Sequence, residues 1–122
     1  MYAAYNRGDI EATLQTLHPE VEWQTSDVAL HRQTYRGHEG VRSFFEDNLE
    51  IWDDHHVDAE DFIEVGEYVV VPIRLRGRGK ASGVEVAARF VQVWGFRDGK
   101  IAQLRVYVDE AEALEAAGGG RR

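Results

Sequence analysis

The sequence predicts an α+β fold in which a curved antiparallel sheet packs against about three helices and encloses a pocket. Three observations lead to this prediction. Apolar residues recur with helical spacing up to Trp52, alternating strand patterns fill the chain from His55 onward, and that alternation gathers apolar side chains on one sheet face. Helices must cover such a face. Because three helices are few for a long bent sheet, we expect a cavity between the two layers.

The helices are predicted from spacing and end signals. The segment from Tyr2 to Leu17 is helical with a break at residues 6–8, because Gly8 suits a helix end and Asp9 suits the next N-cap. An amphipathic helix follows from His38 to Trp52. Its apolar side holds Val41, Phe44, Phe45, Leu49 and Trp52. A short third helix begins after Asp109 and ends near Ala117.

The strands are predicted between and after these helices. A first strand covers Val21 to Thr25, and a loop without periodicity follows from Ser26 to Arg36. The remaining strands are Val57–Val65, Tyr68–Arg76, Val84–Phe96 and Ile101–Val108. The last two are joined at Asp98-Gly99, a dipeptide that is typical of a tight hairpin turn.

Alternation assigns the strand side chains to two faces. The inner face of the long strand has one polar member, Gln92, whose buried amide needs a ligand, a water or another side chain as its partner. In the last strand we expect Ala102 to share the inner face with Leu104 and Val106. The outer face holds Arg74, Arg76, Arg89 and Arg105 with Glu85, Val91, Val93 and Tyr107.

Length and composition fit one folded domain, which we place at residues 1–117, with a flexible Gly/Arg tail at 118–122. The 122 residues are 43% hydrophobic, which is enough for a core. A formal net charge of -8 argues against partners such as nucleic acids and anionic membranes, since both attract basic surfaces. The opening residues contain no long apolar run, so we expect a cytoplasmic protein.

Neither a metal nor a cofactor is expected. The chain has no Cys, which excludes disulfides and thiolate-bound metals. Asp53-Asp54-His55-His56 with Asp58 has the composition of a metal cluster, but adjacent His residues on a strand point to opposite faces. We interpret this segment as a solvated turn.

Several short motifs follow one another in a characteristic order. They are YNRGDIEA at 5–12, HPEVEW at 18–23, YRGHEGVR at 35–42, WGFRDGKI at 94–101, and YVD at 107–109 with EAL at 112–114. Together they resemble SnoaL-like domain proteins of the nuclear-transport-factor-2-like superfamily over essentially the whole chain. The resemblance implies a cone-shaped, cystatin-like sheet around a pocket, and a homodimer through the outer sheet face. Members include polyketide cyclases, ketosteroid isomerases, epoxide hydrolases and binding proteins.

The resemblance also aligns three residues with catalytic carboxylates of the family. Thr25 matches the base of ketosteroid isomerases, Gln92 matches their hydrogen-bonding Asp, and Val106 matches the Asp of cyclases and epoxide hydrolases. Thr and Val cannot transfer protons at neutral pH, whereas a Gln amide still donates a hydrogen bond. A one-residue change of register would instead turn Arg105 and Tyr107 inward. The three replacements favour binding over proton transfer.

Other candidate residues are aromatic or lie in the loop expected at the pocket mouth. Trp23, Phe45 and Trp94 either line the pocket or fill a solid core. In the mouth loop, Asp27 and His31 form either a general base or part of an ordinary polar surface. They are the candidate catalytic residues. The candidate ligand-binding residues are Trp23, Thr25, Tyr35, Phe45, Gln92, Trp94 and Val106.

Three functions are consistent with these observations. We favour a protein that binds a small, mostly apolar molecule. The alternative is an enzyme of the polyketide cyclase, ketosteroid isomerase or epoxide hydrolase type that uses the mouth residues. A second alternative is a non-catalytic dimerisation module. The outer sheet face is either solvated or forms a homodimer, for which Tyr107 and the Val91/Val93 pair provide apolar surface.

Overall fold

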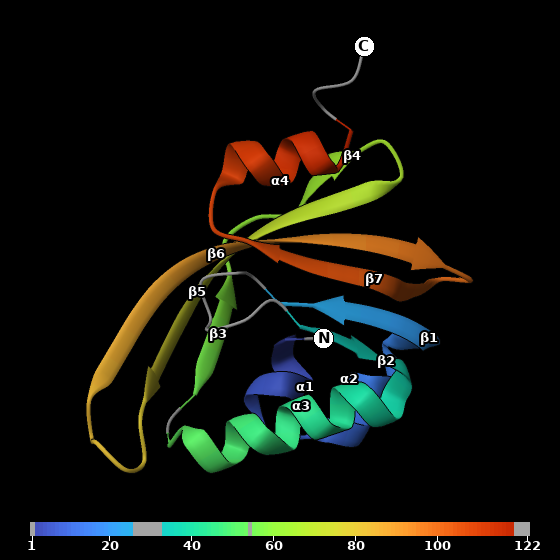
Figure 1. The fold of residues 1–122 in the computed structure, drawn as a ribbon. Helices are drawn as coiled ribbons and strands as arrows, with labels where there is room; N and C mark the ends of the chain where they lie inside the picture. Colours follow the sequence, from blue (N-terminus) through green and yellow to red (C-terminus); the bar gives the residue numbers. More distant parts are fainter. Residues whose placement is uncertain (1, 26–32, 54, 119–122) are drawn as a thin grey trace.

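The computed structural model describes residues 2–25, 33–53 and 55–118. Figure 1 shows the helices and strands of this part of the chain. They are α1 (Tyr2–Asn6), α2 (Ile10–Gln15), β1 (Leu17–Gln24), β2 (Thr34–Arg36), α3 (Gly37–Ile51), β3 (His56–Ala59), β4 (Ile63–Val65), β5 (Tyr68–Arg78), β6 (Glu85–Arg97), β7 (Lys100–Tyr107) and α4 (Glu110–Ala116). Within the described residues, no helix is long and apolar enough to cross a membrane.

The strands form one curved sheet with the order β2-β1-β7-β6-β5-β3, and β4 pairs with β5 beside this path. The pairings between these strands are antiparallel except for that of β1 with β7, which is parallel. The predicted α+β fold with a curved sheet is confirmed, and this single parallel pairing makes the sheet mixed. The long strands β5 and β6 carry most of the bend (Figure 1).

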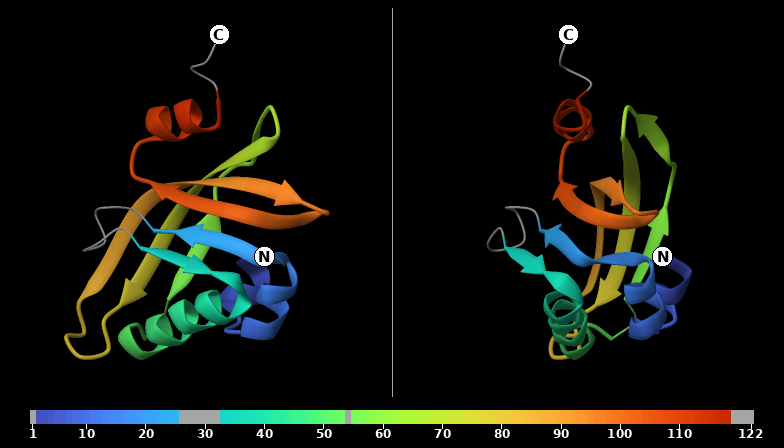
Figure 2. Two further views of the ribbon diagram at one scale, coloured as in Figure 1. Left: turned by 45° about the vertical axis from the view of Figure 1, so that its right-hand side comes forward. Right: turned by 90° about the vertical axis from the view of Figure 1, so that its right-hand side faces the viewer.

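Helices lie on both sides of the sheet. In Figure 1 and in both views of Figure 2, α1, α2 and α3 lie on one side and α4 lies on the opposite side. The inner core lies under the first three helices and contains Leu14, Leu17, Val21, Trp23, Val41, Phe45, Val57, Val71, Ile73, Trp94, Ile101 and Leu104. A second cluster lies under α4 and contains Val70, Val91, Val93, Ala113 and Ala117. The Val91/Val93 pair is therefore covered by the chain's own helix.

Local end signals start α2 and α4 as expected, but the helical segment predicted to reach Leu17 ends at Gln15, because Leu17 already belongs to β1. Gly8 has a φ of 75°, and the Asp9 carboxylate accepts a hydrogen bond of 3.0 Å from the backbone N–H of Ala12. Asp109 caps α4 in the same way, accepting from the N–H of Ala111 at 2.9 Å. These bonds satisfy N–H groups that have no partner within the helix.

The predicted strand Val57–Val65 is wrong in one respect, because the structure divides it into β3 and β4. Opposite the break lies Pro72 of β5, whose carbonyl accepts from the N–H of Glu60 at 2.8 Å. Proline has no N–H to return to the carbonyl of Glu60, so the ladder cannot continue there. The chain leaves the sheet after Ala59 and rejoins it at Ile63.

Two further expectations about the strands need correction. The segment predicted as a loop from Ser26 to Arg36 ends in the strand β2, where Tyr35 pairs with Trp23 of β1. The pairing of β6 with β7 is irregular at one point. Gly95 pairs with Gln103 and Phe96 pairs with Ile101, so β7 has one extra residue, Ala102, between these two pairs. Ile101, which is 4% exposed, therefore joins the inner core, and Ala102 lies on the outer face instead of the inner one.

Candidate functional site

A partly open cavity of about 300 Å³ lies on the concave side of the sheet, and residues of α1, of α3 and of the strands line it. Most of its wall is apolar or aromatic. The lining residues are Tyr2, Tyr5, Trp23, Thr25, Phe44, Trp52, His55, Val57, Ile73, Leu75, Val86, Ala88, Phe90, Gln92 and Val106. No carboxylate occurs among them, so this part of the described structure offers a ligand apolar surface and a few polar groups.

The structure brings together four of the residues predicted to bind a ligand. Trp23, Thr25, Gln92 and Val106 all line the cavity. Thr25 also fixes the chain beside it, because its hydroxyl oxygen accepts from the backbone N–H of Gln33 at 3.0 Å.

The other predicted residues support the cavity wall or lie outside the described structure. Phe45 packs edge-on against Trp23 at a ring separation of 5.4 Å, and Tyr35 packs against Phe44 at 4.9 Å. Trp94 does not line the cavity itself but donates a hydrogen bond to Gln92, which does. The candidate catalytic residues Asp27 and His31 lie outside the described residues, as do residues 119–122 of the predicted tail.

Gln92 is the central polar group of the cavity and is only 5% exposed. The indole N–H of Trp94 donates to its Oε1 at 2.9 Å, and the hydroxyl of Tyr2 donates to the same oxygen. Burial raises the pKa of Tyr2, so its hydroxyl keeps its proton and remains a donor. Side chains therefore supply the partner that we expected for the amide oxygen.

A second polar pair, Tyr5 and His55, lies elsewhere on the cavity wall. The Tyr5 hydroxyl lies 2.9 Å from Nδ1 of His55, and the imidazole stacks on Trp52 with ring centroids 5.9 Å apart. Burial, followed by the neighbouring His56, lowers the pKa of His55 below its ordinary value of 6.5. Burial also raises the pKa of Tyr5. Both side chains are thus neutral at pH 7.

The interpretation of the histidine segment as a solvated turn is wrong for His55, which is half-buried at the cavity. His56 fits it better, because its Nε2 lies 2.9 Å from an exposed carboxylate oxygen of Asp58. Sequence reasoning also missed Tyr2 and Tyr5 as lining residues. Their spacing of three on a helix places them on one face, and this signal could have identified them.

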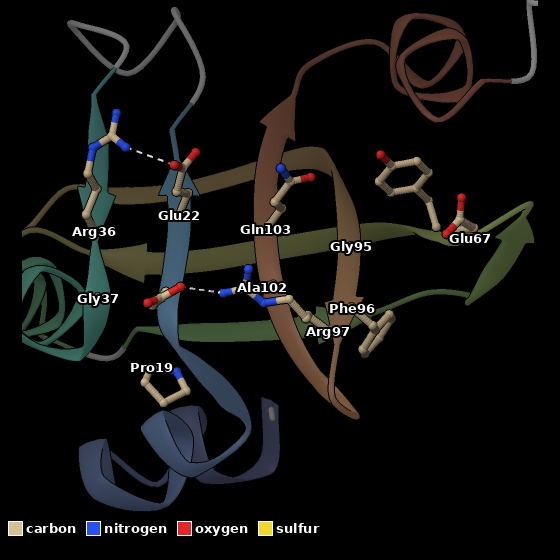
Figure 3. Close-up of a pocket in the computed structure, with 12 residues that line it drawn as sticks. Pro19, Glu22, Arg36, Gly37, Glu67, Gly95, Phe96, Arg97, Ala102 and Gln103 are labelled. Carbon is tan, nitrogen blue, oxygen red and sulfur yellow. Dashed lines mark hydrogen bonds and ion pairs between the residues drawn. The ribbon is translucent and has the colours of Figure 1, made fainter.

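A separate groove of about 670 Å³ lies on the outer face of the sheet (Figure 3). Charged side chains cross it between strands: Arg36 of β2 reaches Glu22 of β1 at 2.8 Å, and Arg97 of β6 reaches Glu20 at 2.7 Å. Phe96, which is 47% exposed, also lines the groove. This mixture of paired charges and exposed aromatic surface differs from the wall of the cavity on the concave side.

A curved sheet wrapped around an apolar cavity is the architecture of nuclear-transport-factor-2-like proteins, and solved structures of this class match the chain. A family model described as SnoaL-like domain matches residues 1–104. The chain therefore belongs to the SnoaL-like domain family, as the order of its motifs predicts. No curated protein matches the chain.

Three solved structures illustrate the similarity. An NTF2-like protein of unknown function from Burkholderia pseudomallei is 28% identical, with 96% of this chain and 91% of that chain covered and a TM-score of 0.78. TerC, co-crystallised with polyporic acid, is 28% identical, with 95% and 91% covered and a TM-score of 0.77. A protein from Jannaschia, provisionally described as a SnoaL-like polyketide cyclase, is 20% identical, with 98% and 88% covered and a TM-score of 0.72; it shows the fold alone.

Proposed function

We propose that this protein binds a small, mostly apolar molecule in the cavity on the concave side of its sheet. The observation that carries the proposal is the cavity of about 300 Å³, whose wall is largely aromatic and aliphatic and contains no carboxylate among the described lining residues. Pockets of this size and character are typical sites for small organic ligands. TerC, a similar protein, was crystallised with a small molecule, which supports the same role here.

The predicted ligand-binding residues have two roles in this proposal. Trp23, Thr25, Gln92 and Val106 contact the ligand directly, because they line the cavity. Tyr35, Phe45 and Trp94 hold the first set in place through ring packing and the hydrogen bond to Gln92.

Binding is favoured over the alternative of a cyclase, isomerase or hydrolase reaction. The cavity positions that match family carboxylates hold Thr25, Gln92 and Val106, and none of these is an acid or base at neutral pH. The Tyr5–His55 pair is the titratable pair with a hydrogen bond at this wall. Its Tyr has a raised pKa, which makes the hydroxyl a poor proton donor in a reaction.

A cavity-filling variant tests the proposal. Bicyclic and tricyclic aromatic compounds should raise the melting temperature of the wild-type protein, since a ligand that binds the folded state stabilises it. Ala88→Phe should weaken their binding by about tenfold or more, because Ala88 lines the cavity and the added ring would occupy ligand space. Ala87→Phe is the matched control, since Ala87 directly precedes Ala88 on β6 and is exposed.

Trp fluorescence provides a second readout, because Trp23 and Trp52 line the cavity and a bound aromatic compound should change their emission. The proposal is contradicted if no compound in the panel changes either the melting temperature or the emission. It is also contradicted if Ala88→Phe, folded by circular dichroism, binds the same compounds as tightly as the wild type.

We also propose that the outer sheet face mediates a homodimer. The Val91/Val93 pair no longer supports this proposal, because α4 covers it. The groove with Phe96, Gln103 and the crossing ion pairs supports it instead, since it combines exposed aromatic surface with charges of both signs. A two-fold interface needs such a self-complementary surface.

A further inference from the structure

The hydrogen bonds around Gln92 define the direction of its amide group. The indole N–H of Trp94 can only donate a hydrogen bond. It lies 2.9 Å from one end of the Gln92 amide, and that end must therefore be the carbonyl oxygen. The Tyr2 hydroxyl donates to the same oxygen. An amide oxygen has two lone pairs, so these two donors use its full accepting capacity.

The amide nitrogen of Gln92 remains as the group without a partner. Within the described residues, this nitrogen makes no hydrogen bond. Every fully buried side-chain nitrogen or oxygen of these residues does have a hydrogen-bond partner, so the Gln92 nitrogen is not fully buried. The nitrogen must therefore contact the cavity that Gln92 lines. The surroundings on the sheet are apolar, since Gln92 pairs with Val71 of β5 and Val106 of β7.

We propose that Trp94 and Tyr2 hold Gln92 with its N–H₂ group toward the cavity, so that the site selects ligands that present an acceptor oxygen at this point. A ketone, quinone or other carbonyl compound fits this requirement, whereas a hydrocarbon of the same shape leaves two N–H groups unpaired in an apolar site. Trp94 is then a positioning residue that determines specificity through Gln92. The inference rests on the proposed function and names the class of ligand for the same cavity.

Matched ligands test the inference. The probes are 1-tetralone, which carries one carbonyl oxygen, and tetralin, which has the same ring system without it. Wild-type protein should bind 1-tetralone about three- to tenfold more tightly than tetralin, the ratio that one net hydrogen bond provides. Gln92→Met keeps the length of the side chain and removes the N–H donors, so the ratio should fall to about one.

Trp94→Phe tests the positioning role. Without the indole N–H, the amide of Gln92 can flip, so that its oxygen and nitrogen exchange places. The ratio of the affinities for 1-tetralone and tetralin should then fall below the wild-type value although Gln92 is still present. Gln24→Met is the control for the Gln-to-Met change, because Gln24 lies on β1 outside the cavity lining, and it should keep the wild-type ratio. A purely structural role of Trp94 would weaken both ligands equally and leave the ratio unchanged.

The outcomes separate this inference from the proposed function. If wild-type protein binds both compounds with equal affinity, the cavity binds ligands, but the inference that the N–H₂ group of Gln92 selects ligands with an acceptor oxygen is wrong. If it binds neither compound while other aromatic compounds of the panel bind, the inference fails and the proposed function stands. If no compound of the panel binds, the proposed function fails and the inference fails with it. Where a variant does not fold, NMR of the wild type decides. The side-chain amide resonances of Gln92 should shift with 1-tetralone and not with tetralin, and the reverse result overturns the inference.

Discussion

His55 shows how a single residue of the cavity wall links function to stability. Its imidazole is half-buried, stacked on Trp52 and hydrogen-bonded with Tyr5. Burial and the nearby His56 lower its pKa in the folded state. In the unfolded chain the same ring has its ordinary pKa of 6.5, so the unfolded state binds a proton first as the pH falls.

We therefore expect His55 to make the protein less stable in mild acid. The free energy of unfolding should decrease as the pH falls through 6.5, and this loss should be complete once the pH is below the folded-state pKa. His55→Gln retains a partner for Tyr5 but cannot titrate in this range. Urea unfolding between pH 7.5 and 5 should give a smaller decrease for this variant than for the wild type.

The same variant has an internal control at lower pH. Arg89 lowers the pKa of Glu60 and Arg42 lowers that of Glu11 through hydrogen bonds, so both carboxylates lose stabilising interactions as the pH falls below their ordinary value of 4.5. His55→Gln should leave this acid limb unchanged. Equal slopes for wild type and variant between pH 6.5 and 5 would contradict the assignment to His55.

At the scale of elements, α1 depends on the contacts that its side chains make with the sheet. A helix of five residues is unstable alone in water. Besides the bonds of Tyr2 and Tyr5, the side chain of Asn6 donates to the carbonyl of Val57 at 2.8 Å and accepts from its N–H at 2.9 Å. Asn6 thus pairs with the edge strand β3 as a neighbouring strand would.

Asn6→Ala should reduce the free energy of unfolding by about 1–3 kcal/mol, because it leaves the partly buried N–H and C=O of Val57 without these partners. Gln15→Ala is the control, since Gln15 is exposed on α2. Urea unfolding checks the difference, and faster hydrogen exchange at the Val57 amide locates it. A variant as stable as the control would show that Asn6 does not anchor α1.

At the scale of the whole molecule, the sheet separates two surfaces with different proposed roles. The concave side holds the cavity. The convex side is divided between the area under α4 (Figure 1) and the outer groove (Figure 3). A ligand and a second copy of the chain could therefore bind at the same time. The proposed dimer uses only the groove, since the apolar area under α4 is already covered.

Sedimentation velocity tests the dimer. Wild-type protein should sediment as a dimer, and Phe96→Glu should shift it toward the monomer, because a charge would replace an exposed apolar ring at the border of the groove. Val84→Glu is the matched control: Val84 is 59% exposed but does not line the groove. A monomeric wild type, or an equal effect of both changes, would contradict this interface.

Local patterns in the chain were sufficient to predict much of this architecture. Side chains alternate along any strand, so the inward direction of Val71, Ile73 and Gln92 follows from their spacing alone. The caps at Asp9 and Asp109 depend on residues only a few positions away. The family follows from the order of its motifs, and the match over residues 1–104 confirms it.

Contacts between distant segments produced the features that these patterns do not contain. The extra residue Ala102 is visible only when β7 is paired with β6, and the covered Val91/Val93 pair only when α4 folds back onto the sheet. The direction of the Gln92 amide likewise depends on Tyr2, ninety positions away. Spacing along a strand states which face a side chain occupies. It does not state which distant groups meet it there, because the packing of the whole chain determines those partners.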